Sequence, residues 1–141
     1  MPLLSWLLVA LLLALPAPAG AHSYEVGNVM VGHVWAAPST GSGTEAYVSL
    51  LNRAPQDDQL TSVLAPTAQA SAFVSPANQR IGAIDLAPNR PVVLKPGGYR
   101  ILLAGLDRAV RVGDKIKLTL IFARAGQVQV EALVEAGPSH G

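Results

Sequence analysis

The stretch LKPGGYRILLAGL, Leu94–Leu106, decides the fold. Its PGG tripeptide at 96–98 predicts a turn, because proline fixes its own φ and glycine adopts positive φ without steric cost. The apolar run Tyr99–Ala104 follows at once, and a short apolar run bounded by turn residues is typical of a buried strand. Side chains two apart on a strand share a face, so we expect Arg100 and Leu102 to point the same way.

Composition restricts the class of protein. A chain of 141 residues, half of them apolar, suits one domain with a substantial core. The net charge of +1 and the absence of a basic stripe argue against nucleic acid as a partner. With no cysteine, disulfides, thiolate nucleophiles and thiolate metal sites are excluded. Eleven prolines and thirteen glycines indicate many turns and favour an all-β protein.

Further strands are predicted wherever apolar and polar residues alternate between turn signals. The clearest is a hairpin of Lys115–Phe122 and Gln127–Val134, whose inward residues we expect to be Ile116, Leu118, Leu120, Phe122, Val128, Val130, Ala132 and Val134. The other predicted strands are Tyr24–Ala36, Glu45–Leu51, Leu60–Leu64, Ala68–Val74, Ile81–Leu86 and Val92–Leu94. This spacing of short strands predicts an antiparallel sandwich or barrel.

The first 21 residues have the features of a secretory signal peptide. Leu7–Leu15 is an almost unbroken apolar run, and Ala19-Gly20-Ala21 is an A-x-A cleavage site. Cleavage after Ala21 would leave a single domain, 22–141, in the periplasm with no membrane span, since the apolar run is shorter than the roughly 20 residues that cross a bilayer. The amino-terminal region has no Lys or Arg, so a non-cleaved anchor stays an alternative.

LKPGGYRILLAGL resembles the LKPGGYHIMLMGL-type signature of the periplasmic copper chaperones called PCu(A)C. The stretch VGDKIKLTLIFARAGQVQVEALV, 112–134, is similar to the end of that family's domain, and the likeness covers about 23–134. The resemblance implies a cupredoxin-like Greek-key β-sandwich or barrel. It also implies copper handling linked to assembly of the CuA centre of cytochrome oxidase, with another periplasmic copper-trafficking or oxidase-assembly protein as partner.

The family's copper ligands do not carry over. In that family, His and Met side chains bind Cu(I), and the matching positions here are Val74, Asn78, Arg100 and Leu102, with Phe73 replacing Val74 if the alignment shifts by one. None of these side chains offers the soft thioether or imidazole donor that Cu(I) prefers. A guanidinium has no lone pair to give and repels a cation. The resemblance therefore implies a degenerate site that should not bind copper.

A displaced copper site remains possible at the amino terminus. If cleavage follows Ala21, His22 offers an α-amine and an imidazole together, which form a good chelate for Cu(II). His33 could join it; the alternatives are an unstructured terminus and a half-buried His33 beside Trp35. Met30 lies three residues before His33, so the two would share a metal only across a β-bulge at Gly32. We expect His140, in the C-terminal tail, to be free.

No catalytic pattern is present, since the chain lacks G-x-S-x-G, Walker A and H-E-x-x-H sequences. The adjacent carboxylates Asp57 and Asp58 are predicted to be solvated turn residues, and we expect no enzyme activity. Two functions stay open. One is copper handling with a displaced site; the other is a non-metal binding or scaffold module, whose surface around Tyr99, Arg100 and Leu102 contacts a protein or an anion.

Overall fold

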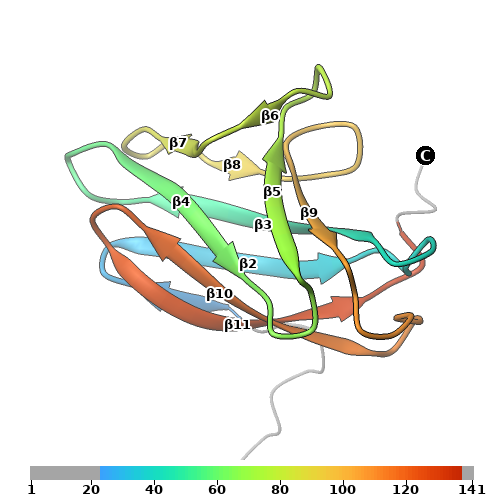
Figure 1. Cartoon of the computed structure of the whole chain (residues 1–141). Coiled ribbons are helices and arrows are strands. Elements are labelled where there is room, and N and C mark those ends of the chain that lie inside the picture. The colour runs from blue at the N-terminus through green and yellow to red at the C-terminus, as the bar shows by residue number, and fades with distance from the viewer. Residues whose placement is uncertain (1–22, 138–141) are drawn as a thin grey trace, which may run out of the picture.

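The computed structural model describes residues 23–137, which form eleven strands and no helix (Figure 1). The strands are β1 Tyr24–Val26, β2 Val29–Ala36, β3 Thr44–Asn52, β4 Asp58–Leu64, β5 Ala70–Val74, β6 Arg80–Ile81, β7 Ile84–Leu86, β8 Val92–Val93, β9 Arg100–Ala104, β10 Lys115–Phe122 and β11 Gly126–Val134. Within the described range, no helical segment has the length and apolar character needed to cross a bilayer.

A single curled sheet contains the strands in the order β6-β5-β9-β3-β2-β11-β10-β4-β7, with β1 paired to β2 and β8 to β3. The sheet curls until β5 lies beside β4, where the Ser71 hydroxyl donates to the carbonyl of Val63 (Figure 1). This near-closed arrangement confirms the predicted all-β, cupredoxin-like sandwich or barrel. One pair departs from the antiparallel pattern: β2 and β11 run parallel, with Trp35 level with Leu133.

The β10–β11 hairpin has the predicted faces. Ile116 pairs with Ala132 and Leu118 with Val130, and all four side chains are at most 2 % exposed. Leu120 pairs with Val128, which is partly buried against the same core. Strict alternation placed these residues correctly because one face of the hairpin packs on the core and the other meets water.

Two predicted strands are each two strands in the structure. The segment 24–36 folds back on itself, because Gly27, at φ +55°, turns the chain and lets Val26 pair with Val29. The segment 81–86 divides at Gly82: β6 pairs with β5, whereas β7 pairs with β4 at the other end of the sheet order. A continuous strand could not reach both ends of the sheet, so the chain bends between them.

Candidate functional site

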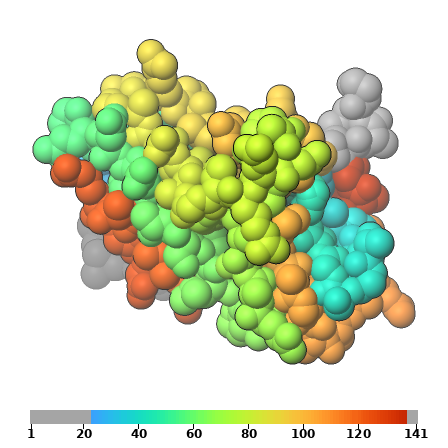
Figure 2. All heavy atoms as spheres, turned by 45° about the horizontal axis from the view of Figure 1, so that its top comes forward, coloured from blue at the N-terminus to red at the C-terminus, as the bar shows by residue number. Residues whose placement is uncertain are grey.

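The β5–β9 pair brings together most of the positions that the resemblance matched to copper ligands. Val74 pairs directly with Arg100, so their side chains share a face, and Phe73 lies on the opposite face against Ile101. Asn78 lies in the turn between β5 and β6 at φ +60°, with its Oδ1 2.6 Å from Nη2 of Arg100. Leu102 lies further along β9, between Ala72 and Glu45. Figure 2 shows the β5–β6 segment beside β9 on the surface.

The guanidinium of Arg100 connects three separate segments. Its Nη1 donates to the carbonyl of Gly98 at 3.1 Å and to that of Ser75 at 3.4 Å, while Nη2 donates to Asn78. Its Nε lies 3.0 Å from Oε2 of Glu45, an ion pair whose N–H does not point at the oxygen. The Arg100 side chain is only 12 % exposed. Protein groups therefore already neutralise and hydrogen-bond this cation.

Glu45 belongs to a face of β3 that also carries Tyr47, and we call this the Tyr47 face. Tyr47 pairs with Trp35 of β2, and the two ring centroids lie 4.4 Å apart. Tyr47 is 3 % exposed and Trp35 is 6 % exposed. Burial, followed by the negative charge of Glu45, raises the pKa of Tyr47 to about 12. The phenol is thus held in its neutral form beside a carboxylate.

A β-bulge lies between Gly32 and Trp35, where β2 has one residue more than β3 opposite it. His33 lies in this bulge at φ +43° and is exposed, with its ring centroid 6.2 Å from that of Trp35. Regular alternation along 24–36 would place Trp35 on the same face as Val29 and Val31, and the bulge moves it to the opposite face. The expectation of a half-buried His33 is wrong. A non-glycine residue at positive φ is uncommon and frequently marks a functional position.

Comparisons with known proteins agree with this fold. The LpqE-like family model matches residues 29–134. The copper-bound PCuAC domain from PmoF2 is 33 % identical, with a TM-score of 0.75, and the match covers 82 % of this chain and 98 % of that one. The chain belongs to the LpqE-like, PCuAC-type family. The apo PmoF2 PCuAC domain is 30 % identical, at a TM-score of 0.75 and coverages of 84 % and 98 %.

A more distant structure shares the fold of this PCuAC-type domain. Cu(I)-bound DR1885 from Deinococcus radiodurans is 24 % identical, with a TM-score of 0.64, and the match covers 84 % of this chain and 83 % of that one. No curated protein sequence matches the chain.

Candidate metal ligands are few in the described part of this PCuAC-type domain. Across residues 23–137, no group of three or more His, Asp or Glu side chains is arranged to hold a metal ion. Only Met30 and His33 supply a thioether or an imidazole in this range, and His33 itself lies in the bulge that follows Gly32. His22 and His140 lie outside the described residues.

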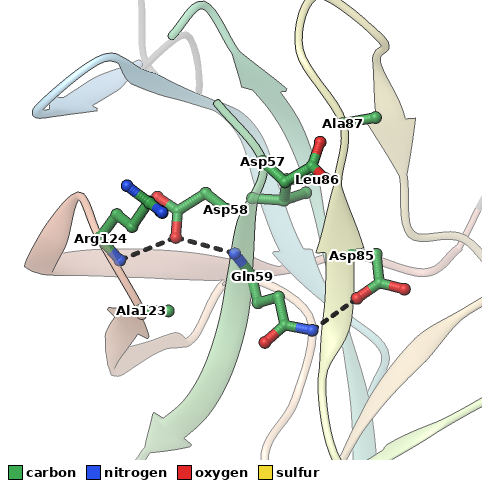
Figure 3. A pocket seen from close by; sticks show the side chains of 8 residues that line it. All are labelled: Asp57, Asp58, Gln59, Asp85, Leu86, Ala87, Ala123 and Arg124. Atoms are coloured by element: carbon green, nitrogen blue, oxygen red, sulfur yellow. Dashed lines mark hydrogen bonds between the residues drawn. The ribbon is translucent and has the colours of Figure 1, made fainter. Parts of the chain in front are cut away.

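The paired carboxylates Asp57 and Asp58 line a pocket beside the turn of the β10–β11 hairpin (Figure 3). Asp58 is 5 % exposed, so the prediction that it is solvated is wrong, whereas Asp57 is exposed. The Asp58 carboxylate accepts backbone N–H bonds from Gln59, Arg124 and Ala125 at 2.8–3.0 Å. It therefore fastens the turn of the β10–β11 hairpin to β4, and these bonds occupy its oxygens.

Sequence reasoning missed Glu45 and Tyr47. They lie 55 and 53 residues before Arg100, and nothing local in E-A-Y indicates a partner. The one available signal was charge: Glu45 is the only carboxylate of the predicted strand 45–51, and Arg100 is the only charged residue of the predicted strand 99–104. Using it required the β3–β9 register, which pairs Glu45 with Leu102.

Proposed function

We propose that this protein handles copper outside the cytoplasm and binds Cu(II) at a displaced site made by His22 and His33. The proposal includes the signal peptide 1–21, because cleavage after Ala21 frees the α-amine of His22. An amine and two imidazoles are donors that suit Cu(II). The similarity to the copper-bound PCuAC domain from PmoF2 supports copper as the cargo.

The exposure of His33 in the bulge of β2 is the observation that carries this proposal. Tyr24 pairs with Val31, and Val26 pairs with Val29. Residue 22 precedes β1 by two positions in the sequence and lies outside the described residues. His33 is exposed at a bulge, so its imidazole is accessible to a metal ion from solvent. The proposal therefore joins the exposed His33 to the histidine that comes two residues before β1 in the sequence.

The family's usual positions are not proposed as a site in this chain. Arg100 and Asn78 bond one another there, and Val74 and Leu102 contribute hydrocarbon. A cation entering would have to displace a guanidinium held by Glu45, at a high electrostatic cost. We infer that the usual Cu(I) site is degenerate and that copper is held instead at His33, in the bulge of β2.

The alternative function, a binding module centred on Tyr99, Arg100 and Leu102, has less support. Anion recognition by arginine needs accessible N–H donors, and the Nη1 and Nη2 donors of Arg100 are directed at Asn78 and backbone carbonyls, while its charge is already paired with Glu45. Tyr99 is 41 % exposed and remains available as an apolar contact. A mature protein that takes up no copper would favour this alternative.

Copper titration of protein that begins at His22 tests the proposal. Trp35 is the only tryptophan after position 21, and its ring lies 6.2 Å from that of His33, so bound Cu(II) should quench its fluorescence. We expect one Cu(II) per chain. The His33→Ala variant should weaken binding by more than the roughly 10–100-fold that loss of an outer-shell partner costs.

Three further proteins complete this experiment. A single residue added before His22 removes the chelating amine and should weaken binding as strongly as His33→Ala. Arg100→Met is the matched control, and its copper affinity should equal that of the unaltered protein. Unchanged affinity in both His33→Ala and the extended protein would overturn the displaced site, and tighter Cu(I) binding in Arg100→Met alone would place the metal at the family's usual positions.

The protein's place in the cell follows as a finer proposal. We infer periplasmic localisation and transfer of copper to an oxidase-assembly protein or to the CuA centre of cytochrome oxidase. Family membership supports this. Amino-terminal sequencing of protein recovered from the periplasm should begin at His22. Deletion of the gene should lower CuA content only under copper limitation, and a normal CuA content there would contradict the delivery step.

A further inference from the structure

A groove in the outer surface of the barrel lies between the segment 37–45 and β9. Its volume is about 440 Å³, within the range of about 300–1,000 Å³ that small-molecule sites occupy. Figure 2 shows the two segments side by side on the surface, in cyan and orange, and Glu45 pairs with Leu102 between them. The groove therefore belongs to the part of the chain that the structure describes.

Small and apolar side chains make the walls of this groove. Ala37 and Pro38 come from the segment before β3, and Leu102 and Ala104 come from β9. Tyr47 also lines the groove although it is only 3 % exposed, so it forms part of the floor. The short side chains of the two alanines leave the space open, and the apolar walls favour a ligand with a flat hydrocarbon body.

Hydrogen bonds hold the wall before β3 in position. The N–H of Ala37 donates to the carbonyl of Glu45 at 3.0 Å, and the hydroxyl of Thr44 donates to the carbonyl of Ala37. At the tip, the N–H of Thr40 donates to the carbonyl of Gly43 at 2.9 Å. The opposite wall, β9, is fixed by its pairing with β3 and β5. The groove is therefore preformed, and binding needs little ordering of the protein.

Glu45 is the one charged side chain among the described residues that line the groove. Its Oε2 is buried against Arg100 while the side chain as a whole is 30 % exposed, which leaves Oε1 as the accessible oxygen. Arg100 does not line the groove, and its Nη donors are directed at Asn78 and backbone carbonyls. The carboxylate is thus held in place and presents a hydrogen-bond acceptor to the groove.

We propose that this groove binds a small neutral phenol, whose hydroxyl donates to Glu45 and whose ring lies on the apolar walls. A hydrogen bond to a carboxylate is about twice as strong as one between neutral groups. A cationic ligand would bring a second positive charge near a carboxylate that Arg100 already neutralises, and an anionic ligand would be repelled by Glu45. A neutral donor avoids both costs, and a phenol joins that donor to a flat apolar ring. Such binding requires no copper.

Amide NMR of the metal-free protein, titrated with para-cresol, tests the site. We expect saturable shifts that are largest at 37–47 and in β9. Para-methylanisole has the same ring but no hydroxyl proton, so it should bind roughly 10-fold more weakly. The cationic para-methylbenzylamine and the anionic para-toluate should also bind more weakly than the cresol does. If the anisole or either ion binds as tightly as the cresol, or if no shift saturates, the proposal is overturned.

Two variants with matched controls locate the bound cresol. Glu45→Gln keeps the shape of the side chain but removes its charge, so affinity should fall roughly 10-fold, whereas Glu131→Gln, in the exposed pair with Lys115, should leave it unchanged. Ala104→Leu fills the groove without altering Glu45 and should abolish binding, while Ala123→Leu adds the same side chain in the β10–β11 turn and should not. Unchanged affinity in either Glu45→Gln or Ala104→Leu would overturn the proposal. Because Ala104 is exposed, its variant keeps the test valid if Glu45→Gln fails to fold.

Discussion

The ion pair between Arg100 and Glu45 should be a major contributor to the stability of the β3–β9–β5 region. Replacing Arg100 with Met removes the ion pair and three hydrogen bonds, and leaves the carboxylate of Glu45 without its partner. Removing one member of a buried pair costs about 3–5 kcal/mol. The Glu45 side chain is 30 % exposed, so water recovers part of that cost and we expect about 2–3 kcal/mol.

A double-mutant cycle measures the pair itself. Arg100→Met, Glu45→Gln and the combined variant are unfolded in urea while Trp35 fluorescence is followed. We expect the combined variant to be more stable than the sum of the single losses predicts, by about 1–2 kcal/mol, because it leaves no unpaired charge. The loss in Arg100→Met alone corresponds to a melting temperature lower by roughly 10 °C.

The chain supplies a matched control for this cycle. Lys115 and Glu131 form a surface pair at 4.0 Å, with side chains 62 % and 49 % exposed. Lys115→Met should cost no more than about 0.5 kcal/mol. If the losses at Arg100 and Glu45 add within about 0.5 kcal/mol, or if Arg100→Met costs as little as Lys115→Met, the two charges do not stabilise each other and the reasoning fails.

Other perturbations test single features of the fold. The pKa of Tyr47 is raised from 10.0 to about 12, so this phenol ionises at a lower pH in the unfolded chain than in the folded protein. The free energy of unfolding should therefore be constant below pH 10 and fall by at most about 2.7 kcal/mol as the pH rises to 12. In urea unfolding, Tyr47→Phe should remove that pH dependence. Asp58→Ala leaves three backbone N–H groups unpaired and should cost about 2–4 kcal/mol by the same assay, whereas Asp57→Ala should stay within about 0.5 kcal/mol. Gly105→Ala should cost at least about 1 kcal/mol by calorimetry, since its φ is +65° and the new Cβ would lie 2.8 Å from that of Gln69; an unchanged melting temperature would contradict this.

Local patterns predicted the parts of the fold that obey strict alternation. The β10–β11 hairpin and β9 were found because apolar residues at every second position have only one stable placement, facing the core. The bulge at His33 was not predictable in this way. A bulge is a property of two paired strands, and nothing in V-M-V-G-H-V-W-A fixes which residue is extra until β3 is placed opposite.

The contacts within the candidate site were not predictable from the sequence. The resemblance selected Arg100, Val74, Asn78 and Leu102 as the positions of the family's ligands, and that assignment stays a prediction. The partner of Arg100 depends on a register that no local pattern encodes. Asp58 was misjudged because a polar turn sequence is usually solvated, and only the docking of the β10–β11 turn onto β4 buries it.

Arg100 with its partner Glu45 lies on one side of the Tyr47–Trp35 pair, and the bulge with His33 lies on the other. We expect the two regions to act independently. A guanidinium with several directed bonds can hold the β5–β6 turn against β9 and β3, as a multidentate ligand set would hold a metal. Arg100 therefore fastens the barrel wall on that side through its own bonds. Arg100→Met should lower stability without changing copper affinity, and His33→Ala should do the reverse. If either substitution changes both stability and copper affinity, the two regions form one site. The proposal that Arg100 is structural while His33 binds copper would then be wrong.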